Sequence, residues 1–92
     1  MDEISLQAKK VYYERRNQDF AACRVAIGSG QFEELQRVGH KIKGNGTTFG
    51  FPELSDLGLR MEQAALNKNM SHIAQCMTEF EHWLEQHISL IK

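Results

Sequence analysis

Apolar residues recur every three or four positions in four stretches of the chain, and short polar or glycine-containing segments separate these stretches. The stretches cover about residues 5–28, 31–46, 52–67 and 71–91. Apolar positions at this spacing form a single stripe on a helix of about 3.6 residues per turn. Four amphipathic helices with short links predict an all-α fold, an antiparallel four-helix bundle with up-down-up-down topology.

The members of the four stripes are the positions that we expect in a common core. The first stripe is interrupted by Lys9-Lys10 and Arg15-Arg16, which leaves open whether this segment is one helix or two. In chain order the expected core positions are Leu6, Tyr13, Phe20, Cys23 and Ile27; Phe32, Leu35, Gly39 and Ile42; Leu54, Leu57, Met61 and Ala64; and Ile73, Met77, Phe80, Leu84 and Ile91.

The segments between the stripes contain residues that end or begin helices. Gly28-Ser29-Gly30 is expected to end the first helix, and the glycine-rich tract 44–50 the second. Pro52 suits the first turn of the third helix, where its missing N–H group has no partner in any case. Asn69 or Ser71 is expected to cap the fourth helix.

Length and composition limit the classes of protein that the chain resembles. Its 92 residues predict one domain over 1–92, and a net charge of −1 without a Lys/Arg run argues against a nucleic-acid site. Cys23 and Cys76 lie on apolar stripes, far apart, so we expect reduced core cysteines and a cytoplasmic setting. The first twenty residues are too charged for a signal peptide or a membrane span.

His40 lies off the apolar stripe of its predicted helix. On a wheel of about 100° per residue it is roughly 120° from the centre of the stripe. Its neighbours one turn away are Gln36, Arg37, Lys43 and Gly44, which form a polar surface around a nucleophile. On helical position alone, a solvated histidine without a role is the more common interpretation of such a residue.

The sequence around this histidine resembles the histidine-phosphotransfer family. That pattern is a histidine followed by an aliphatic residue two positions on, lysine three on, glycine four on and a second glycine ten on. Here His40 is followed by Ile42, Lys43, Gly44 and Gly50 in those places. The tract Phe49-Gly50-Phe51-Pro52-Glu53-Leu54 is similar to the family's entry into its third helix, and the resemblance extends from about residue 10 to 85. Two departures, Gly39 and Asn45 in place of alanine or serine, make the choice of partner harder to predict.

The resemblance implies a phosphocarrier of a two-component phosphorelay rather than an enzyme. His40 would accept a phosphoryl group from a receiver-domain aspartate of a response regulator and pass it to another receiver. The receiver would supply the magnesium ion, so we expect no cofactor and no metal in this chain. No ATP-binding motif is present in the sequence, and no kinase activity is expected. The expected partners are receiver domains, with a hybrid sensor kinase as a further candidate, and neither nucleic acid nor membrane.

Two further residues receive roles from the same resemblance. Lys43, one turn from His40, would neutralise charge on the phosphoryl oxygens. Glu62 lies 22 residues after His40, and in kinase-linked family members a glutamate at this spacing hydrogen-bonds the second imidazole nitrogen. Because Glu62 would act on the imidazole rather than the phosphate, we expect its loss to cost less than the loss of Lys43.

The docking surface for the receiver is expected around the histidine. Gly44 would leave room for the partner to approach; the alternative role for Gly44 or Gly46 is to end the helix. The residues that we assign to this surface are Gln36, Arg37, Gly44 and Thr47.

Three other interpretations of the chain stay open at this point. The first is an adaptor bundle that binds receiver domains without being phosphorylated. The second is a phosphotransfer domain excised from a larger sensor kinase. The third is a metal-binding bundle, but the chain has only one Glu-x-x-His motif, Glu79 to His82, and a weak pair, His72 and Cys76.

Overall fold

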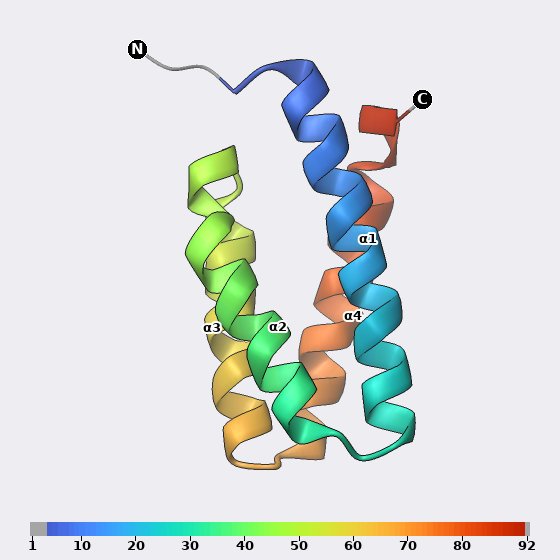
Figure 1. The fold of residues 1–92 in the computed structure, drawn as a ribbon, viewed down its shortest axis with the longest axis vertical. Helices are drawn as coiled ribbons and strands as arrows, with labels where there is room; N and C mark the ends of the chain where they lie inside the picture. Colours follow the sequence, from blue (N-terminus) through green and yellow to red (C-terminus); the bar gives the residue numbers. More distant parts are fainter. Residues whose placement is uncertain (1–3, 92) are drawn as a thin grey trace.

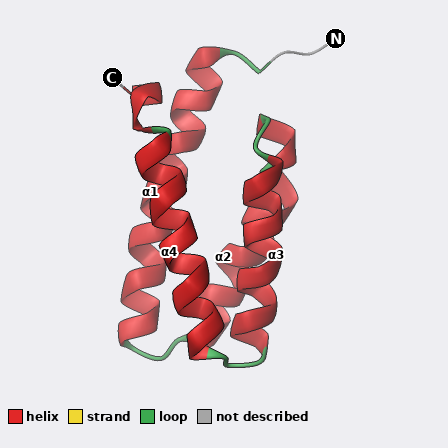
Figure 2. Ribbon diagram, turned by 180° about the vertical axis from the view of Figure 1, so that it is seen from behind, coloured by secondary structure: helices red, strands yellow, loops and turns green. Residues whose placement is uncertain are grey.

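The structure, a computed structural model, describes residues 4–91. Successive helices run in opposite directions, and the loops at the two ends of the bundle are short (Figures 1 and 2). The predicted all-α bundle is therefore confirmed. Its elements are α1 (Leu6–Gly28), α2 (Phe32–Asn45), the 3-10 helix η1 (Thr47–Phe49), α3 (Pro52–Leu66), α4 (Met70–Gln86) and the 3-10 helix η2 (Ile88–Ile91).

Local sequence chemistry explains where most of these helices begin. The Ser5 side chain caps α1 by accepting a hydrogen bond from the Ala8 N–H at 3.0 Å. Pro52 occupies the first turn of α3, as predicted. Asn69, one of the two candidates for the start of α4, caps that helix by accepting from the His72 N–H at 3.1 Å.

The C-terminal segment differs from the single helix predicted over 71–91. The helix α4 ends at Gln86, and η2 follows as a separate turn. His87 takes the capping position with φ −109°, and both its backbone N–H and its Nδ1 lie within hydrogen-bond distance of the Trp83 carbonyl. This carbonyl is one of the orphan acceptors of a helix end, so the side chain of His87 stabilises the stop.

The helix α1 is a single continuous helix, although Lys9-Lys10 and Arg15-Arg16 interrupt its apolar stripe. Arg16 is only 4% exposed because its Nε donates to Asp19 at 2.8 Å and its guanidinium lies 4.6 Å from the centre of the Tyr12 ring. The ammonium of Lys9 lies 5.6 Å from the centre of the Phe51 ring. Arg16 is thus held by residues of α1 itself and Lys9 by the ring that precedes α3, and neither breaks α1.

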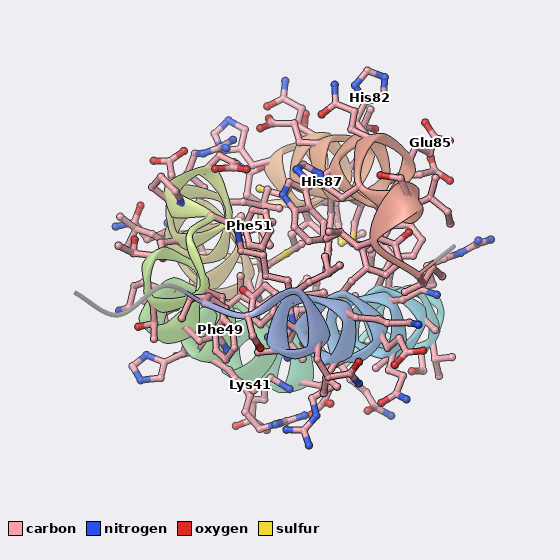
Figure 3. The ribbon with its side chains drawn as sticks, turned by 90° about the horizontal axis from the view of Figure 1, so that it is seen from above. Lys41, Phe49, Phe51, His82, Glu85 and His87 are labelled. Carbon is pink, nitrogen blue, oxygen red and sulfur yellow. The ribbon has the colours of Figure 1, made fainter. Side chains whose placement is uncertain are left out.

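The predicted stripes form the core, with one error at the start of α1. Leu6 is 70% exposed because the first turn of α1 projects beyond the ends of the other helices (Figure 1). Cys23 and Cys76 are buried free thiols, and burial raises the pKa of Cys23 to about 12. At the end of the bundle that holds both termini, an aromatic cluster contains Phe51 and His87, whose rings are 5.2 Å apart (Figure 3).

Candidate functional site

His40 lies on the solvent-facing side of α2, and its side chain is 68% exposed. The opposite side of the same helix carries Leu35, Val38 and Ile42, each no more than 3% exposed. The strong separation of apolar and polar residues on α2 thus holds the imidazole at the surface of a rigid element rather than on a loop.

Glu62 of α3 binds the imidazole across the gap between the two helices. Its Oε2 lies 2.8 Å from Nδ1 of His40. An ionised carboxylate only accepts hydrogen bonds, so this contact assigns the proton of a neutral imidazole to Nδ1. The lone pair is then on Nε2. Within residues 4–91 the bond to Glu62 is the one hydrogen bond that the ring makes, which leaves Nε2 to the solvent.

The same carboxylate holds Lys43, which sequence reasoning did not predict. The Nζ of Lys43 lies 2.9 Å from Oε1 of Glu62, so each carboxylate oxygen has its own partner on α2. The hydrogen bond from Lys43, followed by that from His40, lowers the pKa of Glu62 below its ordinary value of 4.5. Glu62 therefore stays ionised at neutral pH, as its contact with Nδ1 requires.

Two glycines bring α2 and α3 close enough for these contacts. A Cβ added at Gly39 would lie 2.7 Å from the Glu62 backbone nitrogen and 2.8 Å from the Gly58 carbonyl oxygen. A Cβ at Gly58 would clash with the Lys43 backbone nitrogen and lie 2.6 Å from the Gly39 carbonyl oxygen. Gly58 was missed from sequence, although a glycine in the middle of a helix costs about 1 kcal/mol and so indicates a packing reason.

A comparison with known protein families gives the family of the chain. The family described as Hpt domain matches residues 8–89. The chain belongs to the Hpt domain family. Hpt domains are histidine phosphocarriers of phosphorelays, and they interact with receiver domains. No curated protein and no solved structure gives a significant match to the chain.

The residues expected to dock a receiver lie on α2 and η1 of this Hpt domain. Gly44 is exposed, and a Cβ there would meet no atom within 4 Å. Gln36 is half-buried, and Arg37 is exposed but forms two hydrogen bonds to Glu34, at 2.6 and 3.0 Å. Thr47 is exposed, and its backbone N–H donates to the Ser55 hydroxyl at 2.8 Å. The helix α2 ends at Asn45, so Gly44 lies inside it and is not its stop.

The residue after His40 points in a different direction. Lys41 binds Asp19 of α1, with 2.8 Å between Nζ and Oδ1. Two adjacent residues of α2 thus connect to opposite neighbours, His40 to α3 and Lys41 to α1. The contact of Lys41 was not predicted, because helical spacing places a residue on a face without naming what it meets.

The metal-binding alternative receives no support from the described part of the chain. Among residues 4–91, no three His, Cys, Asp or Glu side chains gather closely enough to hold an ion. Both carboxylate oxygens of Glu79 are bound by Arg60, at 2.7 and 2.9 Å. Over the same residues, no helix combines the length and apolar character needed to cross a bilayer.

Proposed function

We propose that this Hpt domain accepts a phosphoryl group on Nε2 of His40 from the aspartyl phosphate of one receiver domain and passes it to the aspartate of another. The observation that carries the proposal is the pair formed by His40 and Glu62, 2.8 Å apart, on an otherwise solvent-exposed imidazole. It fixes the tautomer in which the exposed nitrogen is the nucleophile.

The transfer needs no base to remove a proton from His40. The lone pair of Nε2 attacks phosphorus, the bond between phosphorus and the aspartate oxygen breaks, and the carboxylate leaves with the electron pair. Because Nδ1 keeps its proton, the phosphorylated ring carries a positive charge. The ionised Glu62 faces that charge across a hydrogen bond and stabilises it. The reverse steps deliver the group to the second receiver.

Lys43 supplies a positive charge one helical turn from the phosphoryl group on His40. Glu62 holds its ammonium beside the imidazole before transfer, and 38% of the Lys43 side chain is exposed. From this position the flexible side chain exchanges one carboxylate oxygen for the oxygens of the incoming phosphoryl group. Phosphoryl transfer depends mainly on such positioning and charge neutralisation. The magnesium ion belongs to the receiver, and the chain supplies no metal ligand to the step.

The test is labelling of the chain by a receiver domain that carries radioactive aspartyl phosphate. Wild-type protein is expected to gain an acid-labile, base-stable label, as a phosphohistidine gives. His40→Gln should abolish the label and keep the helical content measured by circular dichroism. The matched controls are His72→Gln and His82→Gln, two exposed histidines of α4 that should label as wild type does.

Two outcomes would contradict the proposal. Label that persists in His40→Gln would assign the phosphoryl group to another residue. A receiver that binds the wild-type chain with the same affinity as His40→Gln, but labels neither, would instead identify an adaptor that carries no phosphoryl group.

A further inference from the structure

A cavity of about 590 Å³ lies between α1 and α2. These two helices are at the front of the bundle in Figure 1. The cavity is bounded at one end by η1. Lys41 and Phe49, which both line it, lie on the α1–α2 side of the bundle (Figure 3). The function proposed above gives this cavity no role. Its other lining residues that bear on a ligand are Tyr12, Arg15, Arg16 and Asp19.

The charges that line the cavity are strongly unbalanced. Arg15, Arg16 and Lys41 contribute three cations, whereas Asp19 is the one acidic side chain of the lining. Both oxygens of Asp19 are already occupied, Oδ2 by Arg16 and Oδ1 by Lys41, each at 2.8 Å. The cavity therefore has an excess of positive charge that no group of its lining neutralises, and this excess favours an anionic ligand.

A buried cation, Arg16, distinguishes this cavity from a patch of exposed lysines and arginines. Its side chain is only 5% exposed and is held between Asp19 and the Tyr12 ring. Its Nε donates to Asp19 and its guanidinium also lies against the Tyr12 side chain, so Arg16 contributes a fixed positive charge to the cavity. A guanidinium fixed in this way attracts a carboxylate group of a ligand in the cavity.

The other end of the cavity is apolar. Val11, which is 38% exposed, lines it together with Ala8 and Phe49, whose ring stacks on Tyr12 at 4.4 Å between centres. A small inorganic anion would leave this end uncovered. A protein segment that carries an acidic side chain beside an apolar one fits both ends.

The cavity and the phosphotransfer site share α2, because Lys41, which lines the cavity, follows His40 directly on that helix. A domain that covers the exposed imidazole therefore lies beside the cavity. We propose that the cavity binds an acidic side chain of the receiver domain docked at His40, and that its excess positive charge selects which receivers dock. This inference rests on the proposed function and assigns it a specificity-determining surface.

The experiment compares two charge reversals on the same helix. Arg15→Glu reverses a charge in the cavity. Arg24→Glu is the matched control, because Arg24 is exposed on α1 but lines a different hollow, between α1 and α4, where Glu81 balances it. The probe is a receiver domain that labels wild-type His40, loaded with magnesium and beryllofluoride to imitate its aspartyl phosphate. Binding is measured by titration calorimetry at low and high salt.

We expect Arg15→Glu to raise the Kd roughly ten-fold or more at low salt, because a like charge then faces the acidic side chain. Arg24→Glu should stay within about two-fold of wild type. The difference between the two variants should shrink at high salt. Replacing acidic residues of the receiver by lysine, one at a time, should restore affinity for Arg15→Glu at one of them.

The failure of this inference and that of the proposed function give different results. If the receiver labels wild-type His40 but binds Arg15→Glu and Arg24→Glu with equal Kd, the cavity is not a docking surface. Amide chemical-shift changes confined to α2 and α3 on adding the receiver, with none at Gln18 or Asp19, would overturn it as well. If no receiver labels the wild-type chain, the proposed function fails first.

Discussion

The two faces of α2 pack against their neighbours in opposite ways. Toward α3, Gly39 and Gly58 bring the two backbones together so closely that neither position has room for a Cβ. Toward α1, polar side chains add contacts outside the core, Asp19 with Lys41 and Tyr12 with Asn45, and a cavity of about 590 Å³ lies between the helices.

This difference separates two requirements of a phosphocarrier. The side of α2 toward α3, here called the close face, holds the His40–Glu62 contact at 2.8 Å, because neighbouring backbones move little relative to each other. The side of α2 toward α1, here called the open face, leaves polar groups and space that a partner surface can occupy. The small residues at the α2–α3 interface thus fix the position of His40 relative to Glu62. The polar residues at the α1–α2 interface are available to recognise a partner.

The largest expected effect comes from forcing the close face apart. Gly58→Ala adds a Cβ against backbone atoms of Gly39 and Lys43, which have no rotamer to change. We expect the free energy of unfolding to fall by about 3 kcal/mol, measured by urea titration. The rate of transfer from a phosphorylated receiver should fall too, because Glu62 would move away from His40.

Gly44→Ala is the matched control for that variant, since Gly44 lies on the same helix as Gly39 but faces open space. Here the added Cβ meets nothing, and the better helix propensity of alanine should raise stability by about 0.5–1 kcal/mol. If Gly44→Ala and Gly58→Ala change stability alike, the close approach of α2 and α3 is not what these glycines provide.

Gly44→Arg, by contrast, should block docking of the receiver sterically while the fold stays intact.

The next effect tests the contacts that cross the close face. Lys43→Ala should slow transfer to His40 by about 10- to 100-fold, which corresponds to roughly 1.4–2.8 kcal/mol in the barrier. Sequence reasoning ranked Glu62 below Lys43. Because Glu62 holds both His40 and Lys43, we expect Glu62→Ala to cost at least as much. Single-turnover kinetics with one phosphorylated receiver measures both variants.

Glu62→Gln separates the two roles of that carboxylate. The amide oxygen still accepts from Nδ1, but the charge that faces Lys43 and the phosphorylated ring is lost. An intermediate rate between those of wild type and Glu62→Ala is therefore expected. A Glu62→Ala variant that transfers at the wild-type rate would remove Glu62 from the mechanism, and the close face would then be structural only.

Substitutions on the open face should lower the free energy of unfolding less than Gly58→Ala does, but still measurably. Asp19→Ala leaves Arg16 without its partner at a position where its side chain is 5% exposed. We expect a loss of about 2 kcal/mol in the free energy of unfolding, by chemical denaturation. The control Asp56→Ala removes a 64%-exposed partner of Arg60 and should cost less than about 0.5 kcal/mol. Equal losses would mean that the α1–α2 network contributes no more than a surface ion pair.

The smallest effect is a dependence on pH. The pKa of Glu62 is lowered in the fold, so its contribution to stability is present above its ordinary value of 4.5 and is lost as the pH falls through the folded value. Wild type should therefore be more stable than Glu62→Gln near pH 7, and the difference should shrink as the pH falls below the ordinary pKa value of 4.5. A difference that does not change with pH would show that the charge of Glu62 contributes nothing to stability.

Much of the fold followed from periodicity, and the errors have local causes. The helix starts at Pro52 and Asn69 follow from residues that contact only their own helix end. The predicted helix over 71–91 was wrong because periodicity does not report a cap: the apolar pattern continues through η2, whereas α4 ends at Gln86 with His87 in the capping position. Leu6 failed because a stripe does not show whether a neighbouring helix is long enough to cover it.

The sequence by itself determined the direction in which each side chain leaves its helix, because about 100° per residue is a local property of the backbone. That was enough to place His40 at the surface, with Lys43 one turn away. Only the tertiary structure decided what lies opposite those side chains. The double contact of Glu62, the clash that makes Gly58 necessary and the cavity beside Lys41 depend on the distance and rotation between helices, which side chains from both partners set together.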